Sequence, residues 1–303
     1  MTDHIPRVSV GMPVYNSERW IVEAVDSILR QSYRDLELII CDNASTDGTP
    51  EICRAIVARD RRVRYCLHPE NLGINENYNQ VFRRARGMYF KWASSNDICD
   101  ERLIERCVEV LEARPDVVLC HAHAALFSDR LDTGEEYGDD LDLQDSGADV
   151  RLDKFFREVR LNNVMNGVIR AAALRNTAPI RNFYCSDLVM VAELVLRGKF
   201  VQLPDRMFYR RMSSETSTKF GTPERLRGHY RYYNTERGAR MLLQHWKLVF
   251  GYLGAVVRAP LKGGERVRVY RRFLKQVIWI RHKLAMELYE AARSIFERAP
   301  RAV

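Results

Sequence analysis

The sequence predicts an α/β fold with a mostly parallel sheet, followed by a basic helical C-terminal region. Apolar strand-like runs alternate four times with amphipathic helical segments, which is the pattern of βαβ units. Each of these runs stops at a short polar loop. Residues 221–303 contain 18 Lys or Arg against 6 Glu and no Asp, so the net positive charge of the chain lies in this part alone.

The four expected strands cover residues 7–14, 36–41, 63–67 and 88–92. Helices are expected over 17–31, from 49 onward, over 75–85 and over 101–113. Ser17 and Asp100 stand where an N-cap is needed, and Pro50 suits the first turn of the second helix. The alternation therefore predicts parallel strands joined by helical crossovers.

Polar loops follow these strands at 13–18, 42–48, 68–75 and 93–100. Because crossovers between parallel strands are right-handed, the loops should meet at one edge of the sheet and form a nucleotide-sized cleft. Asp97 could hold a divalent cation there, since Mg²⁺ and Mn²⁺ favour one or two carboxylates plus phosphate oxygens. The alternative is a loop whose Ser, Asn and Asp residues only form turns and a cap.

The chain continues with an expected strand over 117–125 and an acidic run over 128–150, where nine Asp or Glu face one Arg. Such a run is usually a solvated excursion, and its spacing matches no metal site. Further on we expect a strand–turn–helix over 161–174, a helix over 188–196 closed at Gly198, and short strands over 200–203 and 207–211.

The C-terminal region is predicted to be helical from about residue 223. One helix face is apolar: Tyr270, Phe273, Leu274, Val277, Ile280, Leu284, Leu288, Ala292 and Ile295. We expect this face to pack on the main domain, leaving a solvated basic face. The alternative is contact with an anionic membrane surface. Nucleic acid is disfavoured, because no binding motif accompanies the charge.

The cysteine pattern and the apolar runs indicate a cytoplasmic protein. The seven cysteines are scattered singly, which is typical of reduced thiols. No signal peptide precedes the first strand. The longest apolar run, 248–257, is too short to cross a bilayer. We expect the protein in the cytoplasm, with any attachment at the inner face of the membrane made through its C-terminal helices.

Several motifs stand in order along the chain: Val8-Ser-Val-Gly-Met-Pro-Val-Tyr-Asn16, Leu38-Ile-Ile-Cys-Asp-Asn-Ala-Ser-Thr-Asp-Gly-Thr49, Asn71-Leu-Gly73, Asn79, Ala85-Arg-Gly-Met-Tyr-Phe90, Ser94-Ser-Asn-Asp97 and Ser186-Asp187. Their order and spacing over residues 7–211 resemble glycosyltransferase family 2. The resemblance implies a GT-A fold, in which a Rossmann-like sheet is flanked by helices. It also implies a hexosyltransferase-type enzyme that transfers a sugar from a nucleotide donor with inversion.

The resemblance implies a role for each motif residue. The donor site would include Pro13, Tyr15, Asp42, Asn71, Asn79 and Asn96. Tyr15 would offer a ring to the base, and Asp42 would accept hydrogen bonds from the base or ribose. Asp97 would bind Mn²⁺ or Mg²⁺. Asp187 would be the general base, and the N-terminus of its helix would favour the ionised carboxylate.

Arg210 and Arg211 are candidate cations for the leaving diphosphate, although such residues on an edge strand are more often solvated. For Asp42 and Asp47 the alternative is an Asx turn, for Asn71 and Asn79 a loop or cap role, and for Asp187 a plain N-cap.

The chain departs from the family pattern twice: Asn96 replaces an expected carboxylate, and Met212 stands where many members have a histidine ligand. His121 and His123 lie in an expected strand, more in keeping with core positions than with ligands.

We therefore expect an inverting glycosyltransferase that acts on a polysaccharide, a glycolipid or a related glycan acceptor, with uridine favoured as the base by resemblance. Residues 1–220 would form the GT-A domain, with about 1–125 for the nucleotide sugar and 126–220 for the acceptor; 221–303 would be the basic helical region. The alternatives are a catalytically impaired nucleotide-sugar-binding protein and a membrane or partner scaffold.

Overall fold

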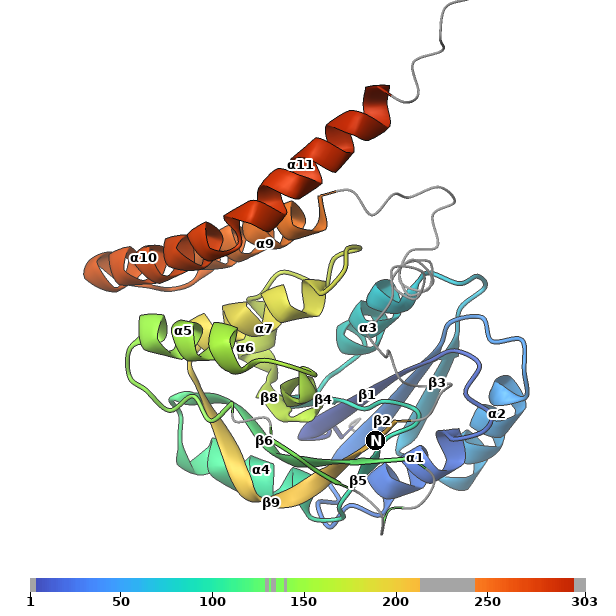
Figure 1. Ribbon diagram of the computed structural model, residues 1–303. Helices are drawn as coiled ribbons and strands as arrows, with labels where there is room; N and C mark the ends of the chain where they lie inside the picture. Colours follow the sequence, from blue (N-terminus) through green and yellow to red (C-terminus); the bar gives the residue numbers. More distant parts are fainter. Residues whose placement is uncertain (1–3, 129–130, 132–134, 139–140, 213–242, 297–303) are drawn as a thin grey trace, which may run out of the picture.

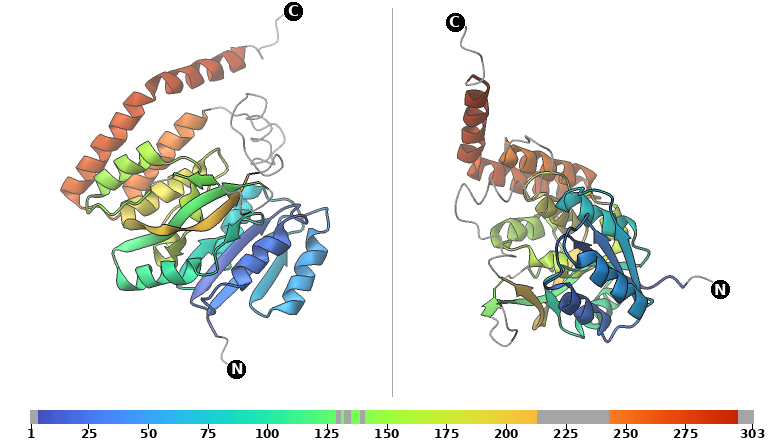
Figure 2. Two further views of the ribbon diagram at one scale, coloured as in Figure 1. Left: turned by 60° about the horizontal axis from the view of Figure 1, so that its bottom comes forward. Right: turned by 90° about the vertical axis from the view of Figure 1, so that its right-hand side faces the viewer.

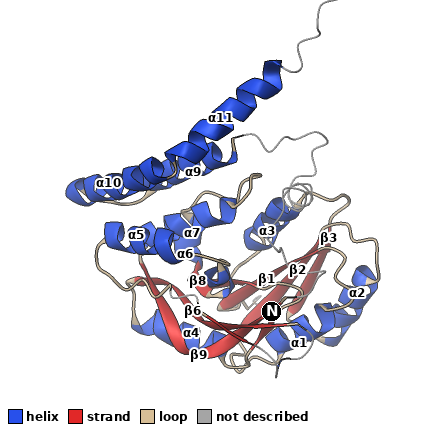
Figure 3. Ribbon diagram, viewed as in Figure 1, coloured by secondary structure: helices blue, strands red, loops and turns tan. Residues whose placement is uncertain are grey.

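The computed structural model describes residues 4–128, 131, 135–138, 141–212 and 243–296. Within these residues one sheet crosses the main body of the molecule, and helices cover both of its faces (Figure 1, Figure 3). The strand order is β3-β2-β1-β4-β8-β6-β9-β5, and β7 pairs with β6 outside this path.

The first half of the sheet is parallel, as predicted. Its strands are β1 (Val8–Val14), β2 (Leu36–Asp42), β3 (Val63–Leu67) and β4 (Tyr89–Trp92). Its helices are α1 (Ile21–Leu29), α2 (Thr49–Arg59), α3 (Ile74–Arg83) and α4 (Leu103–Ala113). Strand β1 lies between β2 and β4, so the loops that follow these strands meet at one edge of the sheet.

The second half of the sheet is mixed. Its strands are β5 (Ile98–Cys99), β6 (Val117–Phe127), β7 (Glu135–Tyr137), β8 (Val168–Arg170) and β9 (Lys199–Arg211). Strand β8 runs antiparallel to both β4 and β6, whereas β9 runs parallel to β6. The prediction of two short strands in place of β9 was wrong. Pro204 and Asp205 suggest a break, but a shift in the β6–β9 register absorbs them within one continuous strand.

The remaining helices are α5 (Ala148–Glu158), the 3₁₀ turn η2 (Asn163–Asn166), α6 (Ala171–Arg175), α7 (Ser186–Arg197), α9 (Gln244–Arg258), α10 (Gly263–Trp279) and α11 (Arg281–Phe296). The acidic run is only partly a solvated loop, because Leu141 and Leu143 are buried and α5 begins inside it. Residues 129–130, 132–134 and 139–140 of that run lie outside the described residues. The predicted strand–turn–helix order over 161–174 was wrong, because the turn η2 comes first and β8 then leads directly into α6.

Two helix caps differ from the prediction. Helix α1 begins at Ile21 rather than next to Ser17, and Ser17 Oγ instead lies 2.8 Å from Ser95 Oγ. Helix α4 begins at Leu103, although Asp100 Oδ1 still accepts a hydrogen bond of 2.9 Å from the N–H of Arg102. The loops after β1 and β4 are thereby connected through a pair of serines.

Alternate residues of the strands face two layers of helices. Val8, Val10, Met12 and Val14 of β1 pack with α1, α2 and α4. Ile39, Phe90 and Trp92 pack on the opposite face with α3, α5 and α7. This period-2 division explains why β2 and β4 are apolar on both sides. At Gly11 a Cβ atom would lie 2.8 Å from both Phe90 and Val81, so glycine is what permits α3 to approach β1 this closely.

Helix α9 packs on α7 and α10 packs on α5, whereas α11 contacts α9 and α10 and its end projects from the body (Figure 1, Figure 2). Buried residues of α9 and α10 belong to the same core cluster as α7. The predicted single apolar face was wrong, because the chain turns at Ile280: Phe273 and Leu284 are buried, whereas Leu274 and Leu288 are exposed. The predicted helical start near residue 223 lies outside the described residues. None of the described helices is both long and apolar enough to span a membrane.

Candidate active site

A pocket with a volume of about 210 Å³ opens between α3, the loop after β4, the turn η2 and the start of α7. Three predicted site residues line it: Asp97, Asp187 and Arg210. They come from three segments far apart in the sequence. Other lining residues include Tyr78, Trp92, Ser94, Arg160, Asn162 and Tyr184.

Asp97 lies at the floor of this pocket and is 8% exposed. Its Oδ1 accepts a hydrogen bond of 2.9 Å from the backbone N–H of Arg211. Burial raises the pKa of Asp97, and the nearby Arg210 guanidinium opposes that rise. The neighbouring Asn96 does not line the pocket, and its Oδ1 accepts a hydrogen bond of 2.6 Å from the Ser94 hydroxyl.

The two arginines at the end of β9, Arg210 and Arg211, have different surroundings. Arg210 Nη1 donates to the carbonyl of Leu161 at 2.7 Å and to Asn163 Oδ1 at 2.8 Å, which holds its guanidinium at the pocket. Arg211 is buried, with its guanidinium 4.0 Å from the Trp20 ring centre and 2.5 Å from Glu23. Arg211 therefore ties β9 to α1, and neither arginine is simply solvated.

Asp187 stands at the N-terminus of α7, as predicted. Its Oδ2 accepts a hydrogen bond of 2.7 Å from Asn162 Nδ2. The residue before α7, Cys185, has left-handed backbone angles that turn the chain sharply into the helix. The helix N-terminus was expected to favour the ionised carboxylate, but the pKa of Asp187 is raised. Burial of the carboxylate is the largest cause, and it outweighs the hydrogen bond from Asn162 and the charge of Arg210.

The predicted donor residues of the first two loops lie outside this pocket. Asp42 is fully buried; its Oδ1 accepts from the N–H of Ser45 at 2.9 Å and its Oδ2 from the Tyr65 hydroxyl at 2.7 Å. Asp47 accepts from the N–H of Thr49 at 3.0 Å at the start of α2, so the turn alternative describes its contacts. Both carboxylates hold loop backbone in place.

Pro13 and Tyr15 stand at the end of β1, and the Tyr15 side chain is one-third exposed at 36%. Asn71 Oδ1 accepts from Asn43 Nδ2 at 2.8 Å within the loop after β3. Asn79 is buried and exchanges two hydrogen bonds with the backbone of Ile180, of 2.8 and 3.0 Å. Asn79 thus anchors the loop before α7, while Tyr15 keeps an accessible ring.

The histidines agree with their predicted core positions. His121 is buried, and burial lowers its pKa to about 4. His123 Nδ1 lies 3.1 Å from Gln202 Nε2. Among the residues that the structure describes, no group of three or more His, Cys, Asp or Glu could hold a metal ion by itself.

The structure adds residues that the sequence patterns did not reveal. Asn162, Arg160 and Tyr184 line the pocket, yet none belongs to a motif. The one available signal was the pair Asn162-Asn163, because asparagine tolerates left-handed backbone angles.

A model of the family described as Glycosyl transferase family 2 matches residues 9–169, more than half of the 303 residues. The chain belongs to glycosyltransferase family 2. Membership confirms the predicted family and the predicted enzyme class, a glycosyltransferase.

Two relatives each match somewhat more than a third of the chain. Glycosyltransferase GlyG of Streptococcus pneumoniae is 40% identical over 114 residues, which cover 37% of this chain and 38% of GlyG. Chondroitin synthase of Escherichia coli is 37% identical over 115 residues, which cover 38% of this chain and 16% of the synthase. The matched segment is thus well under half of each relative.

Solved structures confirm the GT-A fold. TarS 1–349 of S. aureus, in complex with UDP-GlcNAc, has a TM-score of 0.65 at 16% identity; the match covers 89% of this chain and 72% of TarS 1–349. A mannosyltransferase of Pyrobaculum calidifontis, in complex with GDP-Man and Mn²⁺, has a TM-score of 0.51 at 15% identity, covering 98% of this chain and 89% of that enzyme. At these identities the likeness concerns the fold.

Proposed function

We propose that this family 2 member is an inverting glycosyltransferase that moves a sugar from a nucleoside diphosphate to a hydroxyl of a glycan. One observation carries the proposal: Asp97, Arg210 and Asp187 line the same pocket although they stand far apart in the sequence. A diphosphate needs cationic partners, and an attacking hydroxyl needs a base. The pocket supplies both kinds of group.

In this proposal the nucleotide lies along the loops after β1, β2 and β3, with Tyr15 stacking on the base. The printed ligands of the two structural neighbours, UDP-GlcNAc and GDP-Man, support a nucleotide sugar as donor, and uridine is our first choice of base. Pro13 and Asp42 shape the base site, and Asn71 joins the loops after β2 and β3. Asn79 holds the loop before α7, and Asn96 holds the loop after β4 through Ser94.

The residues present fit a divalent cation of the Mn²⁺ or Mg²⁺ type. Asp97 offers one carboxylate beside the backbone of β9, and such cations accept one carboxylate when phosphate oxygens complete the shell. When bound, the cation would neutralise charge on the diphosphate. Asn96 contributes no charge, and its amide oxygen already accepts from Ser94, so Asp97 is the protein ligand that we propose.

The transfer step uses Asp187 and Arg210. The acceptor oxygen attacks the anomeric carbon from the side opposite the diphosphate, and its proton passes to the Asp187 carboxylate. The bond between the anomeric carbon and the phosphate oxygen breaks, and the diphosphate leaves with the electron pair. Arg210 stabilises that negative charge. The raised pKa of Asp187 strengthens its carboxylate as a base.

The acceptor side of this proposal is residues 126–220, which supply η2, α7 and β9, and the donor side is about 1–125. The basic region proposed over 221–303 includes the described helices α9, which packs on α7, and α10, which packs on α5. We propose a polysaccharide, glycolipid or related glycan as acceptor and a hexose-type sugar as the transferred group.

The substitution Asp187→Asn tests this function. We expect it to reduce transfer by about 10²–10⁴-fold while leaving donor binding intact, because it removes the base and keeps the shape. Donors are first ranked by thermal shift with UDP-GlcNAc, UDP-glucose and GDP-mannose with Mn²⁺; nucleotide release and the anomeric configuration of the product are then measured. Asp26→Asn on the surface of α1 is the control. Full activity of Asp187→Asn, or retention at the anomeric carbon, would contradict the proposal.

We also propose that the helical region rests on an anionic membrane surface. An outer face on α10 and α11 consists of Val267, Leu274, Ile278, Trp279, Met286 and Tyr289, each 51–71% exposed. Exposed Arg271, Lys275, Arg281 and Lys283 adjoin it, and Glu265 is the only acidic residue in 263–283. Apolar and aromatic residues beside basic ones suit a membrane interface. If a second copy of the chain bound to this face, two basic surfaces would repel each other. The charge of the face therefore favours an anionic membrane over self-association.

A further inference from the structure

Asn162 has an unusual backbone for a residue other than glycine. Its angles, φ 55° and ψ 37°, are left-handed, and its carbonyl accepts a hydrogen bond of 3.2 Å from the N–H of Met165 at the start of η2. Asparagine and glycine are the residues that adopt these angles most readily. The backbone therefore fixes the direction in which the Asn162 side chain enters the pocket.

The two ends of the Asn162 amide have different surroundings. Nδ2 donates to Asp187 Oδ2 at 2.7 Å, which also fixes the amide orientation, because Oδ1 would repel the carboxylate. Oδ1 is buried and has no hydrogen-bond partner among the described residues, while the whole residue is only 9% exposed. A buried acceptor without a partner is rare in folded proteins and points to a ligand that supplies a donor.

The same short segment also holds the guanidinium of Arg210. Arg210 Nη1 donates to the Leu161 carbonyl and to Asn163 Oδ1, on either side of Asn162. Residues 161–163 thus connect Arg210 and Asp187, which come from β9 and α7. The segment sets the spacing between the group that would stabilise the leaving diphosphate and the group that would take the proton.

We propose that Asn162 is a positioning residue: it holds the Asp187 carboxylate through Nδ2 and presents Oδ1 to the acceptor hydroxyl next to the attacking one. The inference rests on the proposed function, in which Asp187 is the base. A hydroxyl has a single proton, so one hydroxyl cannot donate to both the Asp187 carboxylate and Asn162 Oδ1. An acceptor that uses both of these oxygens therefore needs two adjacent hydroxyls, as sugars have. One hydroxyl loses its proton to Asp187, and its neighbour donates to Asn162 Oδ1.

The effect on protonation can be stated with its sign. The Nδ2–H bond stabilises the ionised carboxylate, so its removal should raise the pKa of Asp187. Other titratable or charged groups on the elements around Asp187 are Asp97, Arg160, Tyr184, Cys185, Arg210 and Tyr252. These remain in place when only the Asn162 side chain is changed, so the change in titration reports on Asn162.

The first experiment follows the side-chain carboxyl of Asp187 by ¹³C NMR during a pH titration of the full chain, with Asp187→Asn identifying the signal. Asn162→Gly keeps the left-handed backbone and removes the amide. We expect its Asp187 midpoint about one pH unit above that of wild type, and that of Asn162→Asp higher still, because a second carboxylate then faces the first. Asn176→Gly, an exposed asparagine outside the pocket, should leave the midpoint unchanged. An unchanged midpoint in Asn162→Gly would overturn the positioning role.

The second experiment uses the nucleotide sugar that wild type consumes fastest, with glycerol and 1-propanol as hydroxyl acceptors at 1 M. Asn162→Gly should lower the rate with glycerol at least tenfold at pH 7 and keep a deficit at high pH, where Asp187 is ionised in both proteins. If the deficit vanishes at high pH, or if glycerol has no advantage over 1-propanol in wild type, the Oδ1 contact is refuted. Failure of every donor, with the titration as expected, would refute the proposed function but not the positioning.

Discussion

At the scale of single residues, the chemistry depends on how deeply the charged side chains of the pocket are buried. Asp97 is buried between cations: Lys91 is fully buried in β4, donates from Nζ to the Asn166 carbonyl and lowers the pKa of Asp97, as does Arg210. The net effect is still a raised pKa, because burial dominates. A divalent cation that favours ionised Asp97 would reverse that balance.

The metal role of Asp97 gives a prediction with two directions. Asp97→Asn should abolish the Mn²⁺-dependent part of donor binding, whereas Asn96→Asp should strengthen it, because the first removes and the second adds a carboxylate. The measurement is the thermal stabilisation by nucleotide sugar with and without Mn²⁺, since a ligand stabilises the state that it binds. An Mn²⁺-dependent shift that persists in Asp97→Asn would rule out Asp97 as the ligand.

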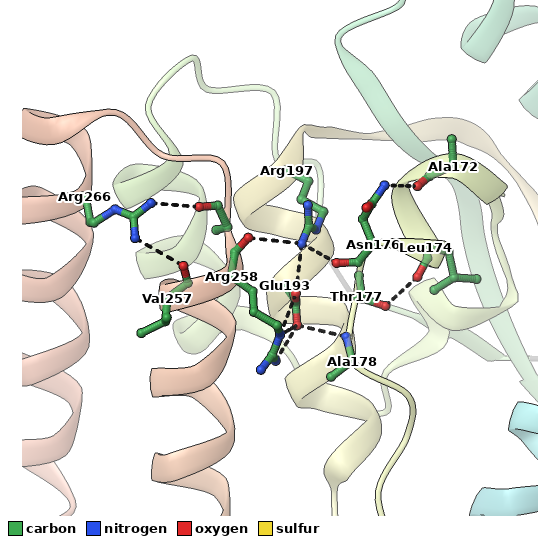
Figure 4. A network of polar contacts seen from close by, with 11 residues as sticks. Ala172, Leu174, Asn176, Thr177, Ala178, Glu193, Arg197, Val257, Arg258 and Arg266 are labelled. Atoms are coloured by element: carbon green, nitrogen blue, oxygen red, sulfur yellow. Dashed lines mark hydrogen bonds and ion pairs between the residues drawn. The ribbon is translucent and has the colours of Figure 1, made fainter.

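At the scale of elements, α7 carries Asp187 at its first turn and is fixed by a buried carboxylate further along. Glu193 is fully buried; it accepts hydrogen bonds from Arg258 of α9 and Arg197 of its own helix, and from the N–H of Ala178 at 3.2 Å (Figure 4). One side chain thereby connects α7, α9 and the loop before α7. The position of Asp187 depends on this connection.

Glu193→Ala should destabilise the protein by about 3–5 kcal/mol, because it leaves buried or half-buried arginines without their partner. The measurement is urea unfolding followed by circular dichroism. The control is Glu51→Ala, which removes an exposed pair with Arg54 and should change the free energy of unfolding by less than about 1 kcal/mol. Equal effects of the two substitutions would show that the Glu193 cluster does not hold the helices together.

At the scale of the whole molecule, one side binds the nucleotide in our proposal and another carries the outer face of α10 and α11. Helix α9 lies between them: its Ala255 and Val256 are buried in the core that it shares with α7. Helix α11 is tied to α9 through Glu287, which accepts a hydrogen bond from the backbone N–H of His245. A surface bound at the outer face would thus contact the same rigid layer that supports α7.

The membrane proposal predicts that the protein sediments with vesicles of phosphatidylcholine and phosphatidylglycerol but not with phosphatidylcholine alone. Binding should weaken as salt rises, because exposed charges are screened. Ile278→Ser with Trp279→Ser should weaken binding at least tenfold, as should Arg271→Gln with Lys275→Gln. Met88→Ser and Arg54→Gln, which are also exposed but lie on the sheet domain, are the controls. Intact vesicle binding in the paired variants, with altered self-association in the ultracentrifuge, would point to a second copy instead.

The sequence by itself determined the strands and helices of the first half, since period-2 and 3.6-residue patterns are local properties. It also placed Asp97 and Asp187 at element ends, because polar residues that stop an apolar run are visible without a structure. It did not predict that β9 is continuous, since the register shift that accommodates Pro204 depends on β6. The division of the C-terminal apolar residues at Ile280 likewise depends on which of them meet α9.

Only the tertiary structure brought Asp97, Arg210 and Asp187 to one pocket, because three separate segments line it. It also set the pKa of Asp187: the helix N-terminus would favour the ionised carboxylate, but burial, which is a property of the whole neighbourhood, raises the pKa. Asn162 follows the same rule. A left-handed asparagine becomes a partner for Asp187 only when η2 and α7 pack together, and no local pattern encodes that contact.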